Sequence, residues 1–324
     1  MNSTLKVNVL ITTFNHSKYI EDTLIGVLNQ RTNFEYNIIV HDDASTDETQ
    51  LILRKYKLKY PDKIILVLQP VNLFSKGIDR YPYIKQYLVA QYIARCEGDD
   101  YWIDYDKLQK QFDFLESNKD FYAVYHNVLT VDEHHCLSHN QNYRIIPARE
   151  YTLNQTIKGS LPGQTASMFS RNFYIAKNHS LISSFNTIRV NGDVRLANLF
   201  TVLGRVYRMS DIMAVHRKVY SSGDSYTART YGKNLTLKRY VGYLDLEKVG
   251  KKFSNGKYTN KVSRRLVVSK IALNRFLKPT NENKRIYKEF KLVKEDSILL
   301  SLATYFTMLP KRLVGRTIRN FISY

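Results

Sequence analysis

The sequence has few cysteines and no long apolar segment. Cys96 and Cys136 are its only cysteines, and their spacing fits neither a zinc site nor a disulfide framework, so we expect the reducing cytoplasm. The apolar run in the N-terminal MNSTLKVNVLITTFNH is too short for the core of a signal peptide, so we expect no export signal there. The apolar run at 298–309 has about a dozen residues, whereas a membrane-spanning helix needs about 20.

Several familiar motifs are absent as well. The chain contains neither GxGxxG nor GxxxxGK[ST], which argues against a dinucleotide fingerprint and a P-loop. Helix-turn-helix, zinc-finger and RNP signatures of nucleic-acid-binding proteins are also missing. Any nucleotide must therefore be bound by a different arrangement of residues.

Positive charge is abundant and unevenly placed. The formal net charge is +20, and residues 226–324 carry 23 Lys and Arg against 6 Asp and Glu, a net charge of +17. Residues 1–225 carry only +3. This shift predicts a boundary near residue 225, and a basic region of this kind typically meets nucleic acid or an anionic membrane surface.

The first hundred residues alternate between strand and helix patterns. Apolar, β-branched strands are expected at residues 7–13, 36–41, 63–68 and 92–96. Asn15 and Ser17 mark the start of one helix, and Ser45 with Glu48 has the form of a capping box that opens a second. This order predicts an α/β fold with a mostly parallel sheet, whose ligands bind at the carboxyl ends of the strands.

Polar residues follow the strands at that predicted edge. Asp42 and Asp43 follow the second strand, and Asp99 and Asp100 follow the fourth in the stretch ARCEGDDYWID. Paired carboxylates at such an edge can hold a divalent cation that bridges phosphate oxygens. The alternative is an acidic turn, or a cap for the helix expected near Asp106.

Three stretches carry a family resemblance. ITTFNHSKYIEDTLIGVLNQ at 11–30, VHDDASTDET at 40–49 and CEGDDYWIDYDKL at 96–108 resemble the family 2 glycosyltransferases, enzymes of the GT-A fold. The resemblance covers about residues 5–225 and implies a GT-A catalytic domain at 1–225. Residues 226–324 lie outside it and are expected to form a basic, mainly helical region.

The resemblance assigns roles to the acidic and aromatic residues of the edge. Thr12 and Phe14 stand where the family contacts the nucleotide base, and Asp43 stands where a carboxylate bonds the uracil NH. Asp99 and Asp100 stand for the DXD element: Asp100 implies a ligand of Mn²⁺ or Mg²⁺, and Asp99 is directed to the ribose and sugar as well as the metal. A UDP-sugar is thus the implied donor substrate.

Basic residues further along the chain receive less specific roles. Arg80 falls in a loop that runs beside the sugar donor in the family, where it could touch a phosphate or the ribose. His216 and Arg217 lie where the family carries a Tyr-Arg-x-His segment over the diphosphate, so His216 joins the implied metal ligands and Arg217 the nucleotide contacts. A solvated loop and an ordinary strand end are the alternatives.

Inverting transfer requires a base for the acceptor hydroxyl. Asp193, in VNGDVRLANLF, matches the place of the family's base, although it also suits a helix N-cap. Asp211, Asp132 and Glu133 are weaker candidates. The segment 161–172 resembles the family's acceptor shelf, with Gln164 or Thr165 toward the acceptor.

The predicted function is an inverting, metal-dependent, non-processive transfer of one sugar from a UDP-sugar. Its acceptor is expected to be a hydroxyl of a lipid-linked glycan in cell-surface polysaccharide synthesis. The processive members of the family carry a Gln-x-x-Arg-Trp motif, which is excluded because Trp102 is the only tryptophan.

The basic region predicts where the enzyme works. Its apolar run followed by Lys311, Arg312, Arg316 and Arg319 suits an anionic membrane surface, which predicts a cytoplasmic enzyme peripheral to the inner face of the plasma membrane. The alternative is a helical domain with solvated charges. A metal-dependent nucleotidyltransferase remains the rival enzyme. A nucleic-acid-binding protein is the remote alternative, because carboxylates at the active edge would repel a polyanion, and no nucleic acid is expected as a partner.

Overall fold

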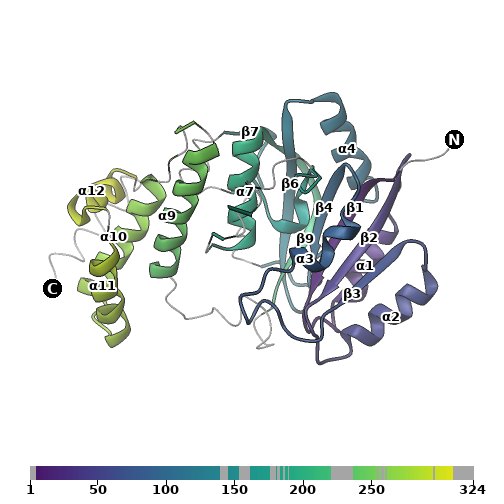
Figure 1. Cartoon of the computed structure of the whole chain (residues 1–324), viewed down its shortest axis with the longest axis horizontal. Coiled ribbons are helices and arrows are strands. Elements are labelled where there is room, and N and C mark those ends of the chain that lie inside the picture. The colour runs from purple at the N-terminus through teal and green to yellow at the C-terminus, as the bar shows by residue number, and fades with distance from the viewer. Residues whose placement is uncertain are drawn as a thin grey trace. The chain divides into compact units, whose positions relative to one another are not determined.

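The structure of the chain is a computed structural model with two compact units (Figure 1). It describes residues 5–138, 145–152, 161–175, 180, 183–184, 187–188, 190–219, 236–253, 255–256, 259, 261–294 and 296–308. Unit 1 comprises Met1–Thr152, Leu161–Asn186 and Leu203–Tyr231, and unit 2 comprises Leu153–Ser160, Thr187–Val202 and Gly232–Tyr324.

Unit 1 is built on a nine-stranded sheet with the order β3-β2-β1-β4-β8-β6-β9-β5, and β7 pairs with β9. The strands are β1 Leu5–Thr13, β2 Glu35–Asp42, β3 Ile64–Leu68, β4 Tyr92–Glu97, β5 Tyr101–Trp102, β6 Phe121–Asp132, β7 Arg149–Tyr151, β8 Phe169–Arg171 and β9 Arg205–Lys218. The α/β class and the parallel arrangement of β3, β2, β1 and β4 are confirmed. The whole sheet is mixed rather than mostly parallel, because β8 runs antiparallel to β4 and β6, and β5 and β7 run antiparallel to β9.

Both faces of the first four strands are buried, which explains their continuous apolar sequences. One face packs against the helices α1 Ile20–Leu28, α2 Thr49–Lys59 and α4 Lys107–Ser117. The other face, which includes Leu10, Ile39 and Ile93, packs against α3 Tyr81–Ile84, η1 Lys85–Tyr87 and Leu88. The short helix η2 Thr165–Ser167 precedes β8. Burial on both faces fixes the position of the loops at the carboxyl ends of the strands.

The capping box predicted at Ser45 and Glu48 is wrong. Helix α2 begins at Thr49 and has no side-chain cap. Ser45 instead donates from its backbone N, at 3.0 Å, and from its hydroxyl to the carboxylate of Asp42. An ionised carboxylate is a stronger acceptor than a neutral group, so it holds Ser45 in the loop after β2.

Unit 2 is helical, which confirms the helical C-terminal region. It contains most of α7 Gly192–Leu203, and α9 Thr236–Phe253, α10 Lys261–Leu277, α11 Asn281–Val293 and α12 Ile298–Met308. An apolar cluster of Tyr240, Val268, Ile271, Ile286 and Phe290 lies between α9, α10 and α11. In the part of the chain that the structure describes, no helix combines the length and apolar character needed to cross a membrane.

Beside this apolar cluster lies a buried ionic group. The guanidinium of Arg264 pairs with Glu247 and, at 2.9 Å, with Asp296. The hydroxyl of Tyr240 donates to Asp296 at 3.2 Å. Because both carboxylates have a charged partner, these polar groups can be buried among the helices.

The boundary predicted near residue 225 lies outside the described residues and stays a prediction. Helix α7, which the sequence assigned to the catalytic domain at 1–225, groups almost entirely with the C-terminal helices. The two compact units are therefore not two consecutive stretches of the chain.

We predict that Gly26→Ala destabilises unit 1 by about 1–3 kcal/mol, the range for overpacked cores. A Cβ at Gly26 would lie 2.6 Å from the backbone oxygen of Trp102, which cannot move without shifting β5. The measurement is chemical denaturation of the variant and the parent. Gly192→Ala is the control, because its Cβ would meet no atom within 4 Å. Equal stability of Gly26→Ala and the parent would contradict the close packing of α1 on β5.

Candidate active site

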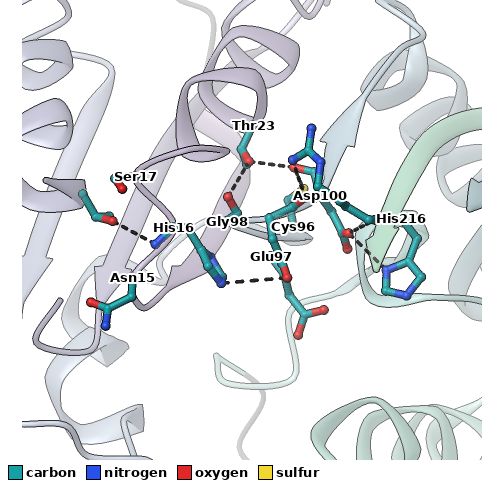
Figure 2. Close-up of polar contacts among 12 residues, drawn as sticks. Asn15, His16, Ser17, Thr23, Cys96, Glu97, Gly98, Asp100 and His216 are labelled. Carbon is teal, nitrogen blue, oxygen red and sulfur yellow. Dashed lines mark hydrogen bonds and ion pairs between the residues drawn. The ribbon is translucent and has the colours of Figure 1, made fainter. Parts of the chain in front are cut away.

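The acidic loop after β4 is fixed by its backbone. Gly98 N donates to the carbonyl of Thr12 at 2.9 Å. The hydroxyl of Thr23, on α1, lies 2.6 Å from Asp100 O and 3.1 Å from Gly98 O (Figure 2). A Cβ at position 98 would lie 2.6 Å from Thr13 Oγ1, so this close approach requires glycine. The loop therefore presents its carboxylates from a rigid backbone.

Asp100 is fully buried, and both of its carboxylate oxygens are engaged. Its Oδ1 accepts from Arg217 N at 2.8 Å and lies 3.1 Å from His216 Nδ1 (Figure 2). Its Oδ2 accepts from the side-chain amide of Gln164. The structure thus brings the loop after β4, the end of β9 and the segment before β8 together at one carboxylate.

The charges in this cluster influence one another. Burial alone would lower the pKa of His216, but the charge of Asp100, its hydrogen bond to His216 and the charges of Asp99 and Glu97 together outweigh burial and raise that pKa to about 9. Burial also raises the pKa of Asp99, the nearby charge of Asp100 adds to the increase, and His16 opposes it. His16 Nε2 lies 3.8 Å from Asp99 Oδ2. The site is a pair of carboxylates flanked by two imidazoles.

Arg217 is buried beneath the loop. Its Nη1 donates to the Asp99 carbonyl at 2.7 Å, and its Nη2 donates to Asp22 Oδ2 at 2.8 Å. The guanidinium also lies over the rings of Tyr19 and Tyr101, at 4.6 and 5.0 Å. Arg217 therefore holds the backbone of the acidic loop in place.

The residues predicted at the nucleotide base lie at the ends of β1 and β2. Thr12 is in β1, Phe14 directly follows it, and Asp43 N donates to Thr13 O at 3.0 Å. The carboxylate of Asp43 accepts from the backbone N of Leu73 at 2.7 Å and of Phe74 at 3.0 Å. Asp43 thus anchors the loop that leads to Arg80.

Arg80 lies close enough to His41, in β2, for its positive charge to act on that side chain. Burial lowers the pKa of His41 to about 4, and the positive charge of Arg80 contributes to this decrease. All the residues predicted to bind the nucleotide or the metal therefore belong to unit 1.

Asp193, the predicted base, belongs to unit 2. It lies in the first turn of α7, and its Oδ1 accepts from Val194 N at 2.8 Å. Burial raises the pKa of Tyr243 on α9, and the negative charge of Asp193 adds to this increase. Of the competing acids, Asp132 binds the backbone N of His134 and Cys136, and Asp211 lies 3.8 Å from Lys110.

Sequence patterns assign no specific role to two residues of the cluster. The family resemblance places Gln164 only toward the acceptor, yet its amide contacts Asp100 and lies 3.2 Å from His216. No motif singles out His16, although it follows β1 at the same carboxyl edge. The position of His16 after a buried strand was the available signal, whereas Gln164 is brought in by a long-range contact.

The donor atoms of this cluster suit a divalent cation. Carboxylate oxygens are ligands of Mg²⁺ and Mn²⁺, and Mn²⁺ also accepts a neutral imidazole nitrogen. Within the described ranges, no three His, Cys, Asp or Glu side chains form a metal-binding group. Mg²⁺ is usually held by one or two carboxylates together with substrate phosphates, so the carboxylates of Asp99 and Asp100 fit a cation that arrives with its diphosphate.

Comparison with known proteins identifies the fold. A crystal structure of S. aureus TarS 1–349 in complex with UDP-GlcNAc superposes with a TM-score of 0.59 and 17% sequence identity, covering 95% of this chain and 82% of that one. The likeness extends over both units, and at this identity it shows the fold alone.

Curated relatives match less than half of the chain. An uncharacterized protein of Mycobacterium tuberculosis is 35% identical over 130 residues, which is 39% of this chain and 36% of that protein. The poly(ribitol-phosphate) beta-glucosyltransferase of Bacillus spizizenii is 32% identical over 116 residues, 36% of this chain and 18% of that enzyme. The match thus spans about a third of the first relative's length and less of the second's.

The family model for glycosyl transferase family 2 matches residues 8–179, more than half of the chain. This range contains most of β1, all of β2 and the loop after β4, so it includes the acidic residues at their carboxyl ends. The chain therefore belongs to glycosyl transferase family 2.

Proposed function

We propose that this glycosyltransferase moves one sugar from a UDP-sugar, with inversion, to a hydroxyl of a lipid-linked glycan in cell-surface polysaccharide synthesis. The observation that carries the proposal is the buried carboxylate of Asp100 beside Asp99, at the edge of the sheet where Thr12, Phe14 and Asp43 also lie. The family match argues for sugar transfer over the nucleotidyltransferase alternative.

The nucleotide assignment rests on Asp43. Its two oxygens each accept one backbone N–H, which leaves further lone pairs for the ring NH of uracil. Phe14 supplies an aromatic face for the base. Arg80 supplies positive charge close to His41 of β2. The complex of TarS with UDP-GlcNAc, a protein of the same fold, supports a uridine nucleotide.

The diphosphate requires positive charge, because negative charge develops on it as the sugar leaves. A cation held by Asp100, with Asp99 and His216, would neutralise this charge when bound. His216 would have to lose its proton to join in binding this cation, because only a neutral imidazole binds a metal. Arg217 acts by holding the Asp99 carbonyl, so that the carboxylate keeps its direction toward the sugar and ribose.

The acceptor hydroxyl must lose a proton as it attacks the anomeric carbon. We assign this proton to Asp193, a half-buried carboxylate at the start of α7. Position in the first turn stabilises its charged form through the helix dipole, which keeps it ready to act as a base. Gln164 is assigned to orienting the Asp100 carboxylate.

The membrane part of the proposal rests on α11 and α12. Leu292 of α11 and Leu299 of α12 have about four fifths of their surface exposed, at 81% and 80%. Lys288, Lys291 and Lys294 lie in the same part of the chain. Exposed leucines with surrounding lysines favour an anionic lipid surface, where lipid-linked acceptors are located. The arginines beyond residue 309 lie outside the described residues.

We predict that Asp100→Asn lowers transfer from a UDP-sugar about 100-fold or more, the scale for losing a key electrostatic group. Asparagine keeps the volume but removes the charge that would bind Mn²⁺. The measurement is transfer from a panel of nucleotide sugars with Mn²⁺ or with chelator, and Asp113→Asn, at an exposed site of α4, is the control. Full activity in chelator, or activity with GDP-sugars alone, would contradict the assignments.

We predict that Asp193→Asn lowers transfer about 100-fold or more but leaves stabilisation by UDP unchanged. The amide keeps the hydrogen bond from Val194 N yet cannot accept a proton from the acceptor. Transfer rates and UDP-dependent melting temperatures are measured together, with Asp211→Asn as the control. If Asp193→Asn is as fast as the parent, another group is the base.

We predict that the double variant Leu299→Gln, Leu300→Gln binds anionic vesicles more weakly than the parent and retains hydrolysis of the UDP-sugar. Both leucines are exposed, at 80% and 48%, so their loss removes apolar contact with lipid without opening the core. Cosedimentation with vesicles measures binding, which should fall with salt because charges are screened over about 8 Å. The control is Leu58→Gln on α2, which is 83% exposed. A parent protein that ignores anionic vesicles at low salt would refute the membrane assignment.

A further inference from the structure

Arg95 is a buried cation without a counterion. It lies in β4, is only 4% exposed, and its backbone N donates to Met168 O at 3.2 Å. Its side-chain Nε and Nη2 have no hydrogen-bond partner among the described residues. Within the same residues, no carboxylate lies within 4.0 Å of the guanidinium. Burial lowers the pKa of Arg95, as expected for a cation removed from water.

Two other arginines of the same sheet have several hydrogen-bond partners. Arg171, in β8, donates to the backbone oxygens of Phe121 and Leu115 and to the hydroxyl of Tyr92. Arg208, in β9, donates twice to Asn127 Oδ1. Buried charges in proteins are normally paired, and an unpaired one destabilises the fold. A functional role for Arg95 would explain why the chain keeps this buried charge although it destabilises the fold.

The surroundings of Arg95 are basic and polar. Tyr174, which forms a side-chain hydrogen bond with Arg95, raises the pKa of Arg95, the charge of Arg80 lowers it, and no acid is among the main influences. Register places Arg95 opposite Leu10, and Ser170 opposite Ile93, so Arg95 and Ser170 project from one face of the sheet. Ser170 Oγ is also buried without a partner among the described residues.

This face continues to the active site. Glu97 follows Arg95 by two residues on β4, so it projects from the same face at the start of the acidic loop. The surface side is formed by Arg80, Tyr81 and Tyr174, which are all partly exposed, and the two tyrosine rings stack at 4.5 Å. Arg95 therefore lies beneath a partly exposed cover next to the proposed substrate site.

We propose that Arg95 and Arg80 form a binding site for an oxyanion of the substrate, either the carboxylate of an acidic donor sugar or a phosphate of the acceptor. The guanidinium fork matches both groups, and its free Nε and Nη2 form one of the edges that bind two oxygens at once. This inference rests on the proposed function. A neutral sugar would leave the cation unpaired, so the site selects for acidic substrates.

The test uses Arg95→Met, which keeps the length of the side chain and removes its charge. Melting temperatures are measured for the full chain with inorganic phosphate, UDP, UDP-glucose and UDP-glucuronate, and with glycerol phosphate, against chloride at equal ionic strength. The free variant should be at least as stable as the parent, because an unpaired buried charge is removed. Arg54→Met, at an exposed site of α2, is the control.

Phosphate should raise the melting temperature of the parent. Arg95→Met should lose this increase with phosphate but keep the increase with UDP. If the oxyanion belongs to the donor sugar, UDP-glucuronate should bind the parent at least tenfold more tightly than UDP-glucose. Arg95→Met should lose this difference. If the oxyanion belongs to the acceptor, glycerol phosphate should stabilise the parent and Arg95→Met should lose that stabilisation. If Arg95→Met does not fold, Arg80→Met should lose the protection by phosphate and the preference for the acidic compound. Because Arg80 is also a proposed nucleotide contact, its protection by UDP should fall as well.

The outcomes distinguish a failure of the anion site from a failure of the proposed function. The anion site would be refuted if Arg95→Met is strongly destabilised while phosphate still protects Arg80→Met against thermal unfolding. Arg95 would then have a structural role. Protection of the parent by UDP without any response to phosphate, glycerol phosphate or the glucuronate would overturn the anion site too. Protection by phosphate without protection by UDP would support the anion site and refute the uridine nucleotide.

Discussion

The carboxylate of Asp100 is the group on which the active site depends. An ionised carboxylate away from water must be surrounded by donors, because leaving it unsatisfied is strongly unfavourable. Its donors come from residues far apart in the chain: Gln164 precedes β8, and His216 and Arg217 end β9. The order of the sheet, with β8 inserted antiparallel beside β4, brings these segments to the end of β4. Placing one buried charge thus constrains three parts of the fold.

Local patterns predicted the first half of the fold well. Strands β1 to β4 begin and end near the predicted residues because their apolar sequences are buried on both faces. The capping box failed because Asp42 competes for Ser45, a contact that helix signals do not include. The antiparallel insertion of β8 and the role of Gln164 depend on tertiary packing. Nothing in the short segment before β8 distinguishes Gln164 from another polar residue.

The surface charge of the basic C-terminal region differs from the net charge of its sequence. Two of its six acidic residues, Glu247 and Asp296, are buried against Arg264. This arrangement removes two negative charges and one positive charge from the surface. The remaining surface is therefore relatively more positive than the sequence count suggests. The same residues stabilise the helices and strengthen the electrostatic character of the region.

The two cysteines differ in a way that has a practical consequence. Cys96 is buried below the acidic loop, and burial together with the charge of Asp100 raises the pKa of its thiol well above the usual value. Cys136 is exposed in the turn after β6, where His135 approaches Tyr101 of β5. Because thiolates react and thiols do not, a maleimide dye would attach to Cys136 alone. The chain therefore carries a single accessible thiol next to His135, whose ring approaches the residue that follows Asp100. A dye at Cys136 would suit the measurement of substrate binding by fluorescence without engineered cysteines.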